Sequence, residues 1–409
     1  MKESRPVLSI KERNRRWNAV RELMKERGVD CLILAGLFGW ENCDAYLTNE
    51  SGRGIVIVPR EGEGTYLAPN ALSMAGHVEN LLRGGESWIE DWRSGPDAPQ
   101  VVAVIQEKGF DSATIGVVGL ESKGVGQMEG YIPFKSWSYI HDHLPKASFV
   151  DISPDFFKLL AAKSDEEIAL ARYAAKVGEM ACEAMIKTAR PGVSETEIFA
   201  AIMNTIYTNG CNARMLIVES GVDNLSWGTP LWLHQAQPPP TVQKGEMVQA
   251  EIFTSYGGIE TQQQMSIALK PVHPINQELA QIARRSYEIG LRELQPGKRF
   301  EEVAEAMEVP VLEAGCWHLC PLIHSLSPQM CASRIHVGMN DLPGIKEYGH
   351  IPEIPIRHGE VVLKPGMLIE LEPNPGRGRH RVVVGGTVLV TENGAEELNK
   401  ICTEMMIAD

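Results

Sequence analysis

The sequence has few cysteines, a deficit of positive charge and no long apolar run. Eight cysteines in 409 residues are too few for a disulfide scaffold, and the nearest pair, Cys316 and Cys320, has no second pair at zinc-ribbon spacing. We therefore expect free thiols that mostly fill the core. No segment reaches the roughly 18 consecutive apolar residues of a membrane-spanning helix, which argues against a membrane protein.

The charge balance limits the class of partner. Lys and Arg total 39 against 53 Asp and Glu, a formal net charge of −14. Nucleic acids and anionic membranes bind cationic surfaces, so we expect neither as a partner and favour a small-molecule substrate. The first residues are charged and lack the apolar run of a secretory signal, so we expect a cytoplasmic protein.

The first part of the chain alternates helical and strand patterns. Residues 10–27 carry a helical stripe of apolar side chains, and residues 31–35 and 114–120 read as buried strands. Residues 54–59 and 65–68 flank two glycines and predict a hairpin. This pattern predicts a compact α/β domain over residues 1–155, without a phosphate-binding loop or a dinucleotide-binding glycine motif.

A second domain is expected over residues 160–409, after a boundary near residues 151–163. Ser164 and Glu167 form a capping box that begins a long helix. A Pro-Gly turn followed by acidic and aliphatic residues occurs at residues 191–198 and again at 296–303. Pro-Gly turns before helices are common, but this repeat favours a domain built from two similar α/β halves.

A family resemblance rests on ordered motifs in this second domain. The first three are a helix start (163–168), a Pro-Gly-x-Ser-Glu element (190–195) and a Ser-Gly…His stretch (220–234). The next three are a strand with a Gly-Gly hairpin (244–258), a Pro-Gly-Met…Glu-Pro segment (364–373) and a closing strand (388–394). Together they resemble the creatinase/prolidase/aminopeptidase P superfamily. The resemblance implies an α+β protein, with a pita-bread catalytic domain behind a smaller α/β domain, and a homodimer.

The resemblance also implies five ligand positions for two metal ions, and this sequence departs from them. The positions fall on Glu251, Gln262, His324, Glu372 and Gly385. Gln262 and Gly385 stand where the family has its bridging carboxylates, and two dications about 3.5–4 Å apart repel strongly without anionic bridges. We therefore expect no cofactor and no dinuclear metal centre. A mononuclear site made by the other three residues remains open.

Creatinase, the metal-free member, supplies the expected catalytic roles. The resemblance implies that His234 is the general base and acid, because imidazole titrates near neutrality. It implies that Glu372 grips a cationic nitrogen group of the substrate and that His324 also belongs to the catalytic set. Strand alternation places Glu370 and Glu372 on one face of a strand. A buried, hydrogen-bonded His remains the ordinary interpretation of His234.

Further polar and aromatic residues are expected to bind the substrate: Glu251, Gln262, Gln264, His336 and Trp232. The two glutamines can read a planar amide or simply pair with each other, and a tryptophan more often packs in a core. Arg334 is expected to bind a substrate carboxylate or to lie on the surface. His318 and His380 stand in loop-like segments and are expected to be solvated.

The predicted function is metal-independent hydrolysis of a C–N bond, of amide, amidine or ureido type, in a small polar molecule. Three alternatives stay open. The first is a lyase in which a His abstracts a carbon-bound proton. The second is an Xaa-Pro peptidase-like metallohydrolase with an atypical mononuclear site, and the third is an inactive relative that only binds its ligand.

Overall fold

The computed structural model describes residues 5–35, 43–50, 53–120, 132–223, 225, 227–342 and 344–409. These residues form two compact units: one is Val7–Leu160, and the other is Ala161–Asp409 together with Arg5 and Pro6. The division falls inside the region 151–163 where the sequence places the boundary. Within the described residues, no helix combines the length and apolar character needed to cross a membrane.

The unit Val7–Leu160 is built on one mixed sheet with the strand order β4-β3-β2-β1-β5-β6. Its strands are β1 (Cys31–Ala35), β2 (Ile55–Pro59), β3 (Thr65–Ala68), β4 (Asp91–Ser94), β5 (Thr114–Val118) and β6 (Ser148–Asp151). Its helices are α1 (Ile10–Glu26), α2 (Cys43–Thr48), α3 (Ala71–Leu82), α4 (Ala98–Glu107), α5 (Phe134–His143) and α6 (Ser153–Ala161). β2 and β3 pair antiparallel, which confirms the predicted hairpin, and β1 pairs parallel with β5.

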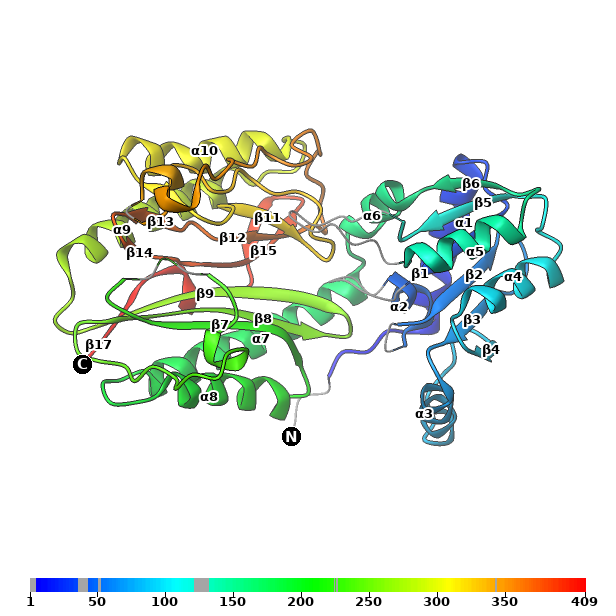
Figure 1. Ribbon diagram of the computed structural model, residues 1–409, viewed down its shortest axis with the longest axis horizontal. Coiled ribbons are helices and arrows are strands. Elements are labelled where there is room, and N and C mark those ends of the chain that lie inside the picture. Colours follow the sequence, from blue (N-terminus) through cyan, green and yellow to red (C-terminus); the bar gives the residue numbers. More distant parts are fainter. Residues whose placement is uncertain are drawn as a thin grey trace. The chain divides into compact units, whose positions relative to one another are not determined.

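The second unit places two helix pairs around a curved sheet (Figure 1). The pairs are α7 (Asp165–Thr188) with α8 (Glu195–Thr208), and α9 (Pro274–Glu293) with α10 (Phe300–Glu313). The predicted capping box begins α7: the Ser164 hydroxyl accepts from the Glu167 N–H, and the Glu167 carboxylate accepts from the Ser164 N–H. This exchange satisfies two amides that a helix start would otherwise leave unbonded.

In the described residues the main sheet has eight strands, six of them in the order β11-β12-β15-β9-β8-β7, with β16 added to β15 and β17 added to β9. The strands are β7 (Asn212–Gly221), β8 (Met247–Tyr256), β9 (Ile259–Leu269), β11 (Ile323–Leu326), β12 (Leu368–Leu371), β15 (Gly385–Thr391), β16 (Gly394–Glu397) and β17 (Met406–Ala408). A small separate sheet contains β10 (Trp317–His318), β13 (Pro375–Arg377) and β14 (His380–Arg381).

The same turn occurs in both halves of this unit. Gly192 and Gly297 have φ angles of 89° and 91°. The N–H of Gly192 donates to the backbone carbonyl of Val242, and the N–H of Gly297 donates to that of Leu363. Each turn leads into a 14-residue helix, α8 or α10. The structure therefore repeats this turn and the helix after it in both halves of the unit, at the two places where the Pro-Gly pattern occurs.

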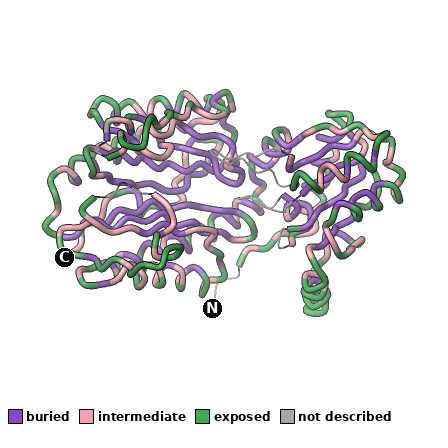
Figure 2. Tube along the Cα trace, in the orientation of Figure 1, coloured by how far each residue is buried: buried purple, intermediate pink, exposed green. Residues whose placement is uncertain are grey.

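The long hairpin β8–β9 separates the core from a buried polar face. Residues such as Ala250, Ile252 and Met265 belong to the apolar core that includes α7 and α8. Because side chains alternate along a strand, the intervening Glu251 and Gln264 point to the opposite face. Both strands are buried along nearly their whole length (Figure 2). Polar side chains on this face must therefore find partners inside the protein.

Candidate active site

Four buried side chains form a continuous chain of contacts on this polar face. Glu251 in β8 lies directly opposite Gln264 in β9, and their side chains are hydrogen-bonded. The amide nitrogen of Gln264 also donates to Oε2 of Glu372 at 2.9 Å. The other oxygen of Glu372, Oε1, lies 3.3 Å from Nε2 of His324. The structure thus brings together four of the predicted site residues from separate strands.

Burial shifts the acidity of both carboxyl groups upward. It raises the pKa of Glu251 to about 7, although hydrogen bonds from Gln264 and Trp227 oppose the shift. Burial, and then the negative charge of Glu251, raise the pKa of Glu372 well above its ordinary value, with the cation Arg381 opposing. The pair therefore retains a proton near neutral pH, as expected of two carboxyl groups that share a dry site.

The imidazole of His324 is neutral in this setting. Burial lowers the pKa of His324 to about 4. Its Nδ1 lies 3.1 Å from the carbonyl oxygen of Ser325 and must donate its hydrogen there. Nε2 is then the acceptor, and it faces Glu372, whose raised pKa favours a protonated carboxyl group. Glu372 and His324 together form a neutral acid–base pair.

Gln262 and Glu370 lie outside this chain. The amide nitrogen of Gln262 donates to Glu260 at 2.9 Å, and its backbone N–H donates to the hydroxyl of Thr387. Glu370 lies 3.0 Å from the same hydroxyl, and burial raises its pKa well above the usual range. It is therefore Gln264, and not Gln262, whose amide lies between the two site carboxylates.

The sequence pattern did not predict a role for Arg381, which ends β14. Its side chain is only 1% exposed, and its guanidinium lies over the ring of Trp227 at 4.3 Å from the centroid. It interacts electrostatically with Glu219, Glu251 and Glu372. A signal was present, because a charged residue followed directly by three valines enters a buried strand and needs a partner.

Three other predicted site residues, Trp232, His234 and His336, make no hydrogen bond or ion pair with these four side chains among the residues that the structure describes. Trp232 donates its indole N–H to Glu195 at 2.9 Å, and its ring packs edge-on against Phe199. His234 follows the short helix η1 (Leu231–Leu233) and is exposed, and among the described residues no hydrogen bond joins its side chain to Glu372. His336 lies 3.4 Å from the carbonyl of Pro352 through Nδ1. Positions 224 and 226 of the Ser-Gly…His stretch lie outside the described residues.

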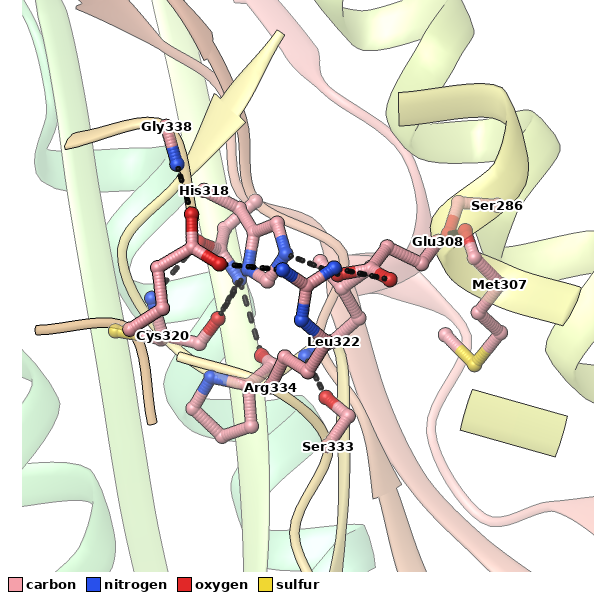
Figure 3. Close-up of polar contacts among 12 residues, drawn as sticks. Ser286, Met307, Glu308, His318, Cys320, Leu322, Ser333, Arg334 and Gly338 are labelled. Carbon is pink, nitrogen blue, oxygen red and sulfur yellow. Dashed lines mark hydrogen bonds and ion pairs between the residues drawn. The ribbon is translucent and has the colours of Figure 1, made fainter. Parts of the chain in front are cut away.

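Beside the site, His318 and Arg334 belong to a partly buried ionic network, which corrects the expectation of a solvated His318 (Figure 3). His318 is fully buried, with Nε2 3.0 Å from Glu308 and Nδ1 2.9 Å from the carbonyl of Cys320. Arg334 pairs with Glu308 at 3.1 Å and also with Glu353. The expectation was wrong because the two-residue strand β10 leaves no periodic pattern in the sequence.

Asn374 connects this network to the site. Its side-chain oxygen accepts from the backbone N–H groups of Leu319 and Cys320, both at 3.1 Å. Its side-chain nitrogen donates to the backbone carbonyl of Glu372 at 2.9 Å. The amide therefore fixes the backbone of Glu372 against the segment that leads into β11 and His324.

These residues do not fit a two-metal centre. A Cβ atom at Gly385 would lie 1.8 Å from the carbonyl oxygen of Leu371, and the φ angle of Gly385 is 148°, so no carboxylate can stand there without moving the backbone. Gln264 directs N–H donors, which cannot ligate a cation, at the two carboxylates. Within the described ranges, no group of three or more His, Cys, Asp and Glu side chains is arranged to hold a metal ion.

Comparison with known proteins defines the class. A model of metallopeptidase family M24 matches residues 169–392, more than half of the chain, and the chain therefore belongs to this family of hydrolases. A creatinase of Bacillus sp. (strain B-0618) is 23% identical in an alignment of 418 positions, gaps included, that covers 97% of this chain and 92% of the creatinase. An Xaa-Pro dipeptidase of Pyrococcus furiosus is also 23% identical, over 74% of this chain and 80% of its own length.

Solved structures confirm the pita-bread fold. The Xaa-Pro dipeptidase of Bacillus anthracis superposes with a TM-score of 0.73 at 20% identity and covers 97% of this chain and 100% of its own. The prolidase of Pyrococcus horikoshii OT3 gives a TM-score of 0.72 at 18% identity and covers 95% of this chain and 98% of its own. Both the fold class and the family that the motifs predicted are therefore confirmed.

Proposed function

We propose that this hydrolase cleaves a C–N bond of amide, amidine or ureido type in a small polar molecule, without a metal ion. The observation that carries the proposal is the amide of Gln264 between Glu251 and Glu372. Hydrogen bonds to a neutral side chain, rather than a bridging acid, join the two carboxyl groups. The likeness to creatinase over nearly the whole chain supports the same assignment.

In the proposed mechanism, Glu251 and Glu372 bind the N–H-rich or cationic part of the substrate. Because the pair shares one proton, its remaining negative charge attracts such a group and stabilises the charge that develops on it, while the protonated carboxyl group is available as an acid. Glu372, poised against the neutral His324, donates a proton to the leaving nitrogen. His234 serves as the base that activates water, and its exposed position after η1 leaves it accessible to solvent.

Elemental analysis of the purified protein tests the proposal first. We expect Mn, Co, Fe and Zn each far below one ion per chain. Two metals per chain would overturn the proposal, and one stoichiometric metal would favour the mononuclear alternative made by Glu251, His324 and Glu372. Turnover in isotope-labelled water then separates hydrolysis from a lyase reaction, because only hydrolysis places the labelled oxygen in the product.

The variant E372Q tests the proposed acid. Once thermal shifts with a panel of amides, amidines and ureido compounds have identified a substrate, we expect E372Q to lower kcat by about 10²–10⁴-fold, the usual contribution of a general acid. The matched control is E370Q, the same change two residues away on a side chain that bonds Thr387. Equal activity of E372Q and the wild type would contradict the mechanism. H234A, measured beside it, tests the proposed base.

A thermal shift without turnover on any compound of the panel would favour the inactive ligand-binding alternative. In that case E372Q and H234A would change the ligand-induced shift without any rate to lose. The two outcomes are distinguishable because binding and product formation are measured on the same compounds.

A further inference from the structure

Arg381 is a buried cation placed among the carboxylates of the site. Its guanidinium lies against the face of Trp227, and it interacts electrostatically with Glu219, Glu251 and Glu372. Those acidic residues come from β7, from β8 and from the end of β12, so the cation lies where three separate segments bring negative charge. Its own strand is fixed in place, because its backbone carbonyl accepts from the side chain of Gln249 at 2.9 Å.

Trp227 contacts both Glu251 and Arg381 and orients them. Its side chain hydrogen-bonds to Glu251, while the face of its ring contacts Arg381. An indole ring offers an N–H donor at its edge and negative potential on its face, so one side chain can hold a carboxylate and a cation together. Arginine suits the position against the face of the ring better than lysine, because its planar guanidinium stacks on a ring and stays charged when buried.

The electrostatics of the site favour such a cation, because a shared proton neutralises only one of the two buried carboxyl groups. Carboxyl groups buried away from water are unstable in the ionised form unless an opposite charge lies nearby. A family site with its full set of acids can obtain that charge from divalent metals, but the donor set here does not fit them, because Gly385 has no room for a side chain and Gln264 is neutral. The chain supplies a positive charge four residues before Gly385.

We propose that Arg381 is the resident cation of this site, a positioning residue that supplies to Glu219, Glu251 and Glu372 the positive charge that metal ions would otherwise provide. The inference rests on the proposed metal-free function. It adds the residue that makes a metal-free arrangement of these carboxylates stable. Arg381 acts through the carboxylates and not on the reacting atoms.

A double-mutant cycle on thermal unfolding tests the inference. We expect R381M, which keeps an unbranched apolar stem but removes the charged guanidinium, to lower the Tm by about 10 °C, because removal of one partner leaves buried charges uncompensated. In E251Q/R381M one of those charges is also absent. Its Tm should therefore lie well above the value expected from adding the two single effects. R381K should lose less than R381M.

The matched control is R379M, two residues away, where the wild-type side chain is half-exposed and pairs with Asp223 at 3.0 Å. Surface ion pairs contribute little, so R379M should shift the Tm by less than about 2 °C. Additive effects of E251Q and R381M, or equal losses in R381M and R379M, would overturn the inference. If R381M is insoluble, soluble yield replaces the Tm. Recovery of yield in E251Q/R381M then supports the inference, and equally poor yield overturns it.

Two outcomes separate this inference from the proposed function. A wild-type protein that carries stoichiometric metal refutes the metal-free function, whatever the cycle shows. A metal-free wild type with an additive cycle leaves that function standing and refutes only the role of Arg381. Chemical rescue adds a further check, since methylguanidinium should raise the Tm of R381A and neutral methylurea, which has the same planar shape, should not.

Discussion

At the residue scale, the sequence shows which residue types can form this site, but it does not show which of their side chains contact one another. The sequence located Glu251, His324 and Glu372 by their motifs, and the structure brings them together. It could not decide between Gln262 and Gln264, because both lie on one face of β9 and only the partner strand determines which amide meets Glu372. Arg381 was missed for the same reason, since two of its three acidic neighbours, Glu219 and Glu251, are far away along the chain.

The close approach at Gly385 gives a prediction at this scale. We expect G385A to destabilise the protein by about 4 kcal/mol or more, because a Cβ would overlap the Leu371 carbonyl and the backbone would have to shift. The control is G378A, where φ is also positive at 57° but no atom lies within 4 Å of the added Cβ. It should cost only about 1 kcal/mol. Chemical denaturation measures both, and equal losses would contradict the steric explanation.

At the element scale, long strands and capped helices were predictable from periodicity and short ones were not. The hairpin β2–β3 and the start of α7 follow from local patterns, and the structure confirms them. The strands β10 and β14 contain two residues each. β10 forms because the distant strand β13 pairs with it, and β14 pairs with β13 across a tight turn. His318 was misread because it lies in one of these strands.

The contact between α10 and β10 predicts an acid-sensitive element. Burial alone would raise the pKa of Glu308, but the hydrogen bond and charge of His318, together with Arg334, hold it below its ordinary value. A carboxylate with a lowered pKa stabilises the folded state above its unfolded pKa, near 4.5, and this contribution is lost as the pH falls through the folded value.

The variant E308Q should therefore lose about 1–3 kcal/mol of stability at pH 7, where it removes the negative charge and one of the two acceptor oxygens that His318 and Arg334 contact. Its stability should also fall less steeply than that of the wild type below pH 4.5. Denaturation at a series of pH values checks both effects. E305Q, the same change at an exposed position of α10, serves as the control and should keep the steep wild-type slope. Parallel pH profiles for E308Q and the wild type would contradict the assignment.

At the scale of the whole molecule, the family and the pita-bread fold were predictable because several weak motifs occur in the right order along the chain. Their order carries the information, since no single motif is diagnostic. The identity of the substrate was not predictable, because it depends on the shape of the site and not on the motifs that define the family.

The oligomeric state gives a prediction at this scale. The resemblance implies a homodimer, and α3 exposes Leu72 and Leu82 at 82% and 83%, apolar surface that a second copy could bury. Sedimentation equilibrium should give twice the chain mass of 45.1 kDa. The net charge of −14 on each copy opposes association, so added salt should tighten the dimer. A single-chain mass at every salt concentration would contradict this prediction.

The close approach of Gly385 to β12 also limits what can be engineered at this position. A single substitution to an acidic residue would place its Cβ against the Leu371 carbonyl, so a carboxylate cannot be added there without a shift of the backbone. The strands β12 and β15 would first have to move apart at this point. A design that aims to install metal ions in this scaffold must therefore rebuild the backbone before it changes the side chain.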